Sequence, residues 1–178
     1  MLCITQPITT KISTVKKIIL FGNSGAGKST LAQKLAQQEN LAHLDLDTLA
    51  WAPTHSAQDI PQRAPIEDSA EKISQFRLTN HSWVIEGCYS DLLALTLTYA
   101  TEVIFLNLPI KLCIENAKSR PWEPHKYPSK EAQDKNLPML IRWIEDYATR
   151  NDEFSLKSHT ALYEKYQGNK SMITSNEN

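Results

Sequence analysis

Short apolar runs alternate along this chain with segments in which apolar residues recur every three or four positions. The runs predict buried β-strands, over residues 16–21, 41–46, 83–85 and 103–108. The periodic segments predict helices, over residues 28–38, 66–76, 92–97, 109–117, 137–147 and 156–163. A more polar stretch, residues 171–175, is a candidate for a last strand. Strands that alternate with helices indicate a parallel sheet covered on both faces.

This order of elements predicts an α/β fold, a three-layer α/β/α sandwich with right-handed crossovers. The chain has 178 residues, and its 41% hydrophobic content is enough for one globular core. We therefore expect a single domain over residues 15–178, preceded by an N-terminal extension over residues 1–14. Residues 49–65 have no clear period, and residues 120–128 contain three prolines, which exclude a helix there.

The composition argues against several classes of protein. A net charge of −1 disfavours a general nucleic-acid-binding surface, which needs a basic face. No apolar run approaches the roughly 18 residues that a membrane helix needs, and residues 1–14 lack the apolar core of a secretory signal. Cys3, Cys88 and Cys113 lie far apart, without the spacing of a zinc site. We expect a cytoplasmic protein with reduced thiols and no membrane association, whose oligomeric state is left open.

Three of the five glycines fall within six consecutive positions, between a predicted strand and a predicted helix. They belong to the octapeptide GNSGAGKS at residues 22–29, which fits the phosphate-binding loop G-x-x-x-x-G-K-[ST]. Glycines let backbone N–H groups approach a phosphate, and the helix N-terminus adds a positive dipole. We expect Lys28 to reach the β- and γ-phosphates of ATP, and the Ser29 hydroxyl to bind Mg²⁺. The residues expected to bind the nucleotide are Gly22, Asn23, Ser24, Gly25, Ala26, Gly27, Lys28, Ser29 and Thr30.

The size of the chain and its remaining motifs narrow the class of P-loop protein. A GTPase would carry Asn-Lys-x-Asp and Asp-x-x-Gly, and neither motif occurs in the sequence. A transporter or ring-forming ATPase would need a longer chain with more motifs. The small kinases remain, which combine a phosphate loop with acidic residues, an acceptor region and a basic lid.

Acidic residues follow two of the predicted strands. Asp45 and Asp47 stand two apart after the second strand, so strand alternation would turn both carboxylates toward the crevice where open α/β sheets bind ligands. We expect Asp45 to hold hydrated Mg²⁺ and Asp47 to orient or deprotonate an acceptor hydroxyl. The alternative is a solvated turn in which an aspartate caps a helix. Glu86, after the third strand, can contact the acceptor or a metal-bound water, or simply lie exposed at the strand end.

A basic, proline-broken segment over residues 118–130 is expected to form a lid. Its Arg120 would neutralise charge on the transferring phosphoryl group. The other cations in or near this segment, which also fit an ordinary charged surface, are Lys118, His125, Lys126, Arg142 and Arg150. The acceptor pocket is expected to be shaped by an insert over residues 51–82 and to contact Asp47, Glu86, Gly87 and Tyr89.

Four segments resemble small bacterial P-loop proteins described as DNA topology modulation proteins, AAA-family ATPases or kinases. They are residues 22–29, 43–51, 83–90 and 103–109, and the resemblance extends over about residues 16–175. The wider resemblance is to adenylate and shikimate kinases. It implies a five-stranded parallel sheet in the order 2-3-1-4-5, Mg-ATP as donor and a closing lid. It also implies that Asp47 binds the acceptor hydroxyl and that Arg120 is the lid arginine.

The chain departs from both kinases in the acceptor region. Glu86-Gly87-Cys88-Tyr89 stands where shikimate kinases carry a triple glycine and adenylate kinases carry an arginine motif. Only Arg63 and Arg77 are available there to clasp a nucleoside monophosphate or a carboxylate. These departures argue against both shikimate and adenylate as acceptors.

We therefore predict a Mg-ATP-dependent phosphotransferase that moves the γ-phosphoryl group of ATP to a hydroxyl or phosphate of a small acceptor. The alternative is an ATP-hydrolysing regulatory switch of the topology modulation type, which acts through a protein or DNA partner. The surroundings of Asp47 and Glu86 discriminate between them, because a closed cavity favours the kinase and open solvent favours the switch.

Overall fold

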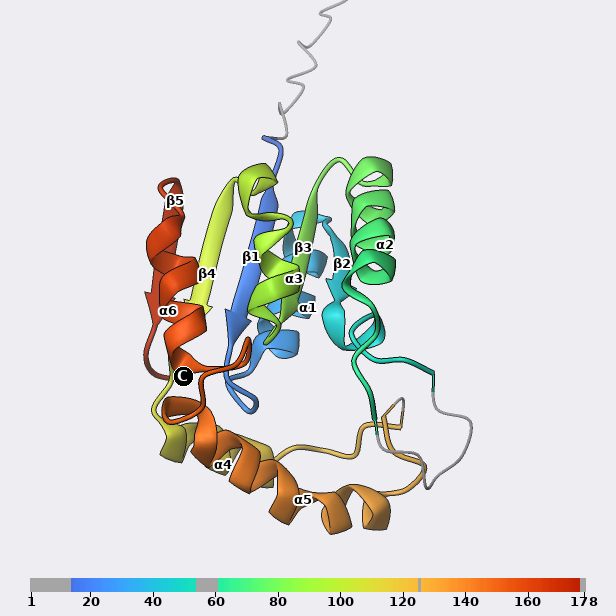
Figure 1. Ribbon diagram of the computed structural model, residues 1–178, viewed down its shortest axis with the longest axis vertical. Coiled ribbons are helices and arrows are strands. Elements are labelled where there is room, and N and C mark those ends of the chain that lie inside the picture. The colour runs from blue at the N-terminus through green and yellow to red at the C-terminus, as the bar shows by residue number, and fades with distance from the viewer. Residues whose placement is uncertain (1–13, 54–60, 125, 177–178) are drawn as a thin grey trace, which may run out of the picture.

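A five-stranded, all-parallel sheet forms the centre of the protein (Figure 1). The computed structural model describes residues 14–53, 61–124 and 126–176. Within these ranges the strands lie in the order β2-β3-β1-β4-β5, which confirms the predicted order. The strands are β1 (Lys17–Gly22), β2 (Ala42–Asp45), β3 (Trp83–Gly87), β4 (Glu102–Leu106) and β5 (Asn169–Ile173). Because every pair is parallel, the loops that follow the strands meet at one edge of the sheet.

Helices cover both faces of the sheet and complete the predicted three-layer sandwich (Figure 1). In Figure 1, α2, α3 and α6 lie in front of the sheet, α1 lies behind it, and α5 runs across the carboxyl ends of the strands. The α-helices are α1 (Lys28–Glu39), α2 (Ile66–Thr79), α3 (Ser90–Ala94), α4 (Ile110–Lys118), α5 (Lys130–Glu145) and α6 (Leu156–Lys165). Three 3₁₀-helices join them, η1 (Leu46–Thr48), η2 (Leu97–Tyr99) and η3 (Asp146–Ala148). None of the helices in the described ranges is long and apolar enough to cross a membrane.

The central strand β1 is apolar from Ile18 to Phe21 because it is covered on both sides. Its alternate residues Ile19 and Phe21 pack in one core with side chains of α2, α3 and α6. Ile18 and Leu20 pack in the other core with side chains of α1, α4 and α5. All four are at most 1% exposed. A continuous apolar run is the expected pattern for a parallel strand between two helical layers.

Several element boundaries differ from the predicted ones for local reasons. The second strand stops at Asp45, because the Asp45 side chain accepts a hydrogen bond from the backbone N–H of Asp47 and starts η1. The long helix α5 begins earlier than its apolar stripe suggested, at a cap in which Ser129 Oγ accepts from Ala132 N at 3.1 Å. The last strand, β5, begins and ends two residues before the predicted one.

One buried histidine links the helical layer to the loop after β3. His159, on α6, is fully buried, and its Nε2 lies 2.9 Å from the carbonyl oxygen of Cys88. Its Nδ1 lies 2.7 Å from the hydroxyl of Tyr147, so a neutral ring donates to Cys88 and accepts from Tyr147. Burial among the rings of Phe21 and Phe105 lowers the pKa of His159 from 6.5 to about 4.

We expect His159 to make the protein sensitive to acid. Between pH 6.5 and about pH 4 the unfolded chain binds a proton at this residue and the folded chain does not, so the free energy of unfolding falls as the pH falls. The loss attributable to this residue approaches about 3 kcal/mol at the lower end. Urea unfolding of the wild-type protein and of His159→Gln, measured across this range, gives the difference in slope. Equal slopes would contradict the assignment.

Candidate functional site

The glycine-rich loop connects β1 to α1 and has the backbone that a phosphate site requires. Gly25 and Gly27 have positive φ angles of 76° and 85°, which L side chains rarely adopt. Gly25 also lies against α4, where an added Cβ would stand 2.2 Å from the carbonyl oxygen of Cys113. The loop is thus held tightly against α4, and its two glycines leave the backbone N–H groups there unobstructed by a side chain of their own.

We expect Gly25→Ala to destabilise the protein more than Gly27→Ala does. Both substitutions strain a positive φ, but only Gly25→Ala also drives a methyl group into the backbone of α4. A Cβ added at Gly27 would have no neighbouring atom within 4 Å. The additional loss in the free energy of unfolding is about 1–3 kcal/mol. Chemical unfolding of the two variants measures it. Equal losses would mean that the contact between the loop and α4 is dispensable.

The predicted nucleotide-binding residues divide into two groups. Those from Ser24 to Thr30 line one large cavity of about 1010 Å³. Gly22 and Asn23 do not line it, and Asn23 is 3% exposed. The Asn23 amide donates to the carbonyl oxygen of Ile144 at 3.1 Å, and its side-chain oxygen accepts from Ser24 N at 2.8 Å. Asn23 therefore anchors the loop to α5 instead of facing the cavity.

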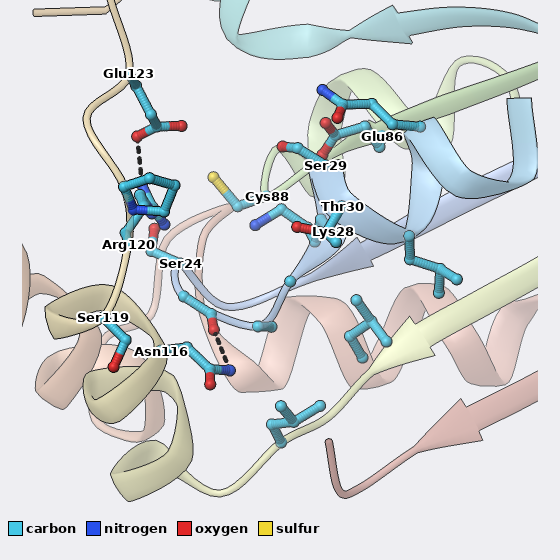
Figure 2. Close-up of a pocket in the computed structure, with 18 of the residues that line it drawn as sticks. Ser24, Lys28, Ser29, Thr30, Glu86, Cys88, Asn116, Ser119, Arg120 and Glu123 are labelled. Carbon is cyan, nitrogen blue, oxygen red and sulfur yellow. Dashed lines mark hydrogen bonds and ion pairs between the residues drawn. The ribbon is translucent and has the colours of Figure 1, made fainter. Parts of the chain in front are cut away.

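Lys28 stands at the start of α1 with its side chain turned over the loop. Its ammonium group donates to the carbonyl oxygen of Asn23 at 3.0 Å. Figure 2 shows Lys28, Ser29 and Thr30 on one side of the cavity, and Ser119, Arg120 and Glu123 on the other. The cavity thus lies between the P-loop and the connection from α4 to α5.

Glu86 is the buried carboxylate of this cavity. It is the last residue but one of β3, which pairs directly with β1, and its side chain is 1% exposed. Its Oε1 has no hydrogen-bond partner among the described residues, and His43 Nε2 is 3.5 Å away. A buried carboxylate oxygen without a partner is unfavourable unless something binds it. Glu86 and the Ser29 hydroxyl are oxygen ligands of the kind that Mg²⁺ prefers, so the residues present fit this ion.

Asp47 lines the same cavity and is held by two groups from distant parts of the chain. Its Oδ1 accepts from the hydroxyl of Tyr89 at 2.7 Å, and its Oδ2 accepts from Lys126 Nζ at 3.1 Å. Tyr89 in turn accepts from Trp51 Nε1 at 2.7 Å. Burial tends to raise the pKa of Asp47, but Lys126, the Tyr89 hydroxyl and Lys28 together lower it below its usual value. Asp47 is therefore a fixed, ionised carboxylate.

The expectation that Asp45 and Asp47 face one crevice is wrong. Asp47 belongs to η1 and not to a strand, so strand alternation does not relate the two side chains. Asp45 does not line the cavity, and its Oδ1 accepts from Asp47 N at 2.9 Å, which is the capping role named as the alternative. Burial, together with the negative charges of Asp47 and Glu86, raises the pKa of Asp45 to about 6.

Two residues predicted to contact an acceptor lie behind the cavity wall. Tyr89 is 2% exposed, so it positions Asp47 and does not itself reach the cavity. Gly87 is also buried, and an added Cβ there would stand 3.0 Å from the side chains of both Leu46 and Tyr89. Gly87 therefore lets η1 pack closely on β3. No described residue of the insert over 51–82 lines the cavity; residues 54–60 lie outside the described ranges.

The α4–α5 connection, residues 119–129, borders the cavity as the lid prediction requires. Arg120 lines it and pairs with Glu123 at 3.0 Å. The other cations in or near the predicted lid differ in whether they reach the cavity. Lys126 lines it, whereas Lys118, Arg142 and Arg150 do not, and His125 lies outside the described residues.

Several residues of the cavity were missed by the sequence analysis, among them Cys88, Asn116 and Asn176. Cys88 follows Glu86 and Gly87 and faces the cavity (Figure 2). Asn116, on α4, donates to the carbonyl oxygen of Gly25 at 2.9 Å and exchanges hydrogen bonds with Asn176 at 3.1 Å. These contacts join residues about 60 and 90 positions apart, so no local pattern in the sequence predicts them.

The fold and the cavity define a small P-loop protein of the kinase-like type. A family model described as an AAA domain (AAA_18) matches residues 18–136, and the chain belongs to this family. Among curated proteins it is 28% identical, over 110 residues, to the uncharacterized protein YqaC of Bacillus subtilis (strain 168). That match covers 61% of this chain and 58% of the relative, so it spans less than two thirds of YqaC.

Solved structures of kinases are among those similar to this chain. A shikimate kinase from Acinetobacter baumannii, solved in complex with shikimate, superposes with a TM-score of 0.50 at 16% identity, covering 93% of this chain and 87% of that chain. A sugar kinase from Janibacter sp. superposes with a TM-score of 0.46 at 15% identity, covering 90% and 85%. The first of these likenesses supports the α/β P-loop architecture.

Proposed function

We propose that this protein is a Mg-ATP-dependent phosphotransferase that moves the γ-phosphoryl group of ATP to a small acceptor. One observation carries the proposal: the fixed carboxylate of Asp47 lines the same cavity as the P-loop and the buried carboxylate of Glu86. A nucleotide site alone needs one carboxylate beside its Mg²⁺, which Glu86 can supply, and does not need Asp47 as a second one. Two carboxylates with different surroundings suit two different tasks.

The donor half of the site is built from the P-loop. The loop amides and Lys28 bind the β- and γ-phosphates, and Lys28 exchanges its bond to the Asn23 carbonyl for them. Ser29 and Glu86 hold Mg²⁺, which neutralises charge on these phosphates when it is bound. Arg120, on the α4–α5 connection that we take as the lid, adds positive charge near the transferring group.

The acceptor half centres on Asp47. Its carboxylate accepts a hydrogen bond from the acceptor hydroxyl, whose oxygen bonds to the γ-phosphorus while the bond to the β–γ bridging oxygen breaks and ADP leaves. The hydroxyl proton passes to Asp47 as the new bond forms. A carboxylate whose pKa is held low orients a hydroxyl better than it deprotonates one. Positioning is the larger need in phosphoryl transfer, because its transition state is loose.

The solvent exposure of Glu86 and Asp47 discriminates between the kinase and the alternative, an ATP-hydrolysing switch. Glu86 is enclosed at 1% exposure, which favours the kinase, whereas the Asp47 side chain is 43% exposed, which by the same criterion favours the switch. ADP release from the purified protein, with Mg-ATP and a panel of hydroxylated metabolites and nucleosides, separates the two. The proposal expects at least one acceptor to raise the rate above the background without acceptor. A rate that no acceptor changes would favour the switch.

A further inference from the structure

We propose that the acceptor is an uncharged hydroxyl compound, of the sugar or nucleoside class, and not an anionic one such as a nucleoside monophosphate or a hydroxy acid. This inference rests on the proposed function and narrows it. It follows from where the chain's five arginines lie and from the charges that surround the acceptor half of the cavity.

Arg63 is one of the two arginines that the sequence placed in the acceptor region. Its guanidinium group is already bonded to other residues of the chain. One terminal nitrogen lies 2.6 Å from Glu153, and the other lies 2.9 Å from Asp91. Its Nε donates to the carbonyl oxygen of Ala50 at 3.1 Å. A guanidinium with two carboxylates and a carbonyl leaves no fork for a substrate phosphate or carboxylate. Arg63 therefore fastens the segment after η1 to α3 and to the loop before α6.

The other arginines of the chain, all of which lie in the described ranges, are also placed elsewhere. Arg77 projects from α2 and stacks 3.5 Å from the ring centre of Tyr99. Arg142 is exposed on α5, and Arg150 is paired within its own loop; neither lines the cavity. Of the arginines only Arg120 lines the cavity, and the proposed function assigns it to the phosphates of the donor. Bidentate recognition of an anionic acceptor thus lacks its usual residue.

Acidic side chains dominate the acceptor half. Asp47 and Glu123 line the cavity on this side, whereas Glu86, the proposed Mg²⁺ ligand, and Lys28 and Lys34 of α1 belong to the nucleotide side. The cation on the acceptor side is Lys126, which lies 3.1 Å from Asp47 and 3.8 Å from Glu123. Burial tends to lower the pKa of Lys126, but the neighbouring carboxylates raise it above its usual value. An anionic group would have to separate this lysine from Asp47 and lie between carboxylates.

The same surroundings suit an uncharged polyhydroxy molecule. The Asp47–Lys126 pair presents a hydrogen-bond acceptor beside a donor without a net charge, which matches neighbouring hydroxyl groups. Trp122, 45% exposed, and Tyr127 line the cavity from the same connection and offer flat apolar faces to a sugar or base ring. A cationic acceptor gains little, because Lys126 already neutralises Asp47.

Matched acceptor pairs test the inference with the full chain. Adenosine against adenosine monophosphate, glucose against glucuronate and ribose against ribose 5-phosphate differ mainly in one anionic group. We expect kcat/KM, from ADP release with Mg-ATP, to be at least about tenfold higher for the uncharged member of the active pair. An equal or higher value for the anionic member would overturn the inference and leave the phosphotransferase standing. If no member raises ADP release above the background, the proposed function fails, and the inference fails with it.

Arg63→Lys separates the roles of this residue. It keeps the charge but loses the two-pronged contact with Asp91 and Glu153, so we expect a lower melting temperature and an unchanged preference between the members of a pair. If Arg63 clasped an acceptor anion, KM for the anionic member would rise selectively. That result would contradict the inference even if the variant is less stable.

Discussion

Lys28→Ala is expected to abolish most phosphoryl transfer while leaving the fold intact. The Lys28 ammonium makes one hydrogen bond within the chain, to the carbonyl oxygen of Asn23, so its loss removes little native stability. Its loss does remove the positive charge aimed at the phosphates. We expect the transfer rate to fall by roughly 100- to 1000-fold, the effect of removing one preorganised donor from a transition state.

Thermal unfolding with and without Mg-ATP checks the binding half of this prediction. Ligand at about 100 times its Kd stabilises a folded protein by about 2.7 kcal/mol, so the wild-type melting temperature should rise clearly and that of Lys28→Ala much less. Lys72→Ala is the matched control, because Lys72 is exposed on α2, which does not line the cavity. Wild-type transfer by Lys28→Ala would refute the assignment of the P-loop as the donor site.

Asp47→Asn is expected to stop transfer without preventing nucleotide binding. Asparagine keeps the size of the side chain and an oxygen that accepts from Tyr89, but it removes the negative charge that holds Lys126 and receives the acceptor proton. Loss of a positioned proton acceptor lowers rates by roughly 10²–10⁴-fold. Steady-state kinetics should therefore show a lower kcat, while the rise in melting temperature with Mg-ATP persists.

Asp45→Asn is the matched control for this variant. Asp45 is two residues away and carries the same charge, but its side chain caps η1 and does not line the cavity. We expect Asp45→Asn to retain most transfer and to lose little stability, since asparagine also caps helices. Full activity in Asp47→Asn, or an equal loss in both variants, would contradict the specific role given to Asp47.

The sheet and the P-loop could be predicted from the sequence because their signals are local. A central strand buried on both faces must be apolar at every position, and residues 22–29 carry a fixed spacing with a mechanical reason for each residue. The strand order came from the resemblance to known kinases and is confirmed.

The acceptor half could be predicted only in part, because its contacts join distant positions. Asp47 is fixed by Tyr89 and Lys126, 42 and 79 residues away, and neither pairing leaves a pattern in the sequence. Arg63 looked available because a sequence does not reveal that Asp91 and Glu153 surround it. Asp45 and Asp47 were expected to face one crevice because alternation assumed a strand, whereas Asp47 lies in a 3₁₀-helix.

The fate of the γ-phosphoryl group tests the central claim most directly. The wild-type protein is incubated with Mg-ATP and the uncharged hydroxyl acceptors, and ³¹P NMR follows where the phosphorus goes. A phosphotransferase yields ADP together with an equal amount of a new organic phosphate ester, and Asp47→Asn yields neither at a comparable rate. Release of the phosphorus only as inorganic phosphate, at a rate unchanged by any acceptor and by Asp47→Asn, would contradict the claim.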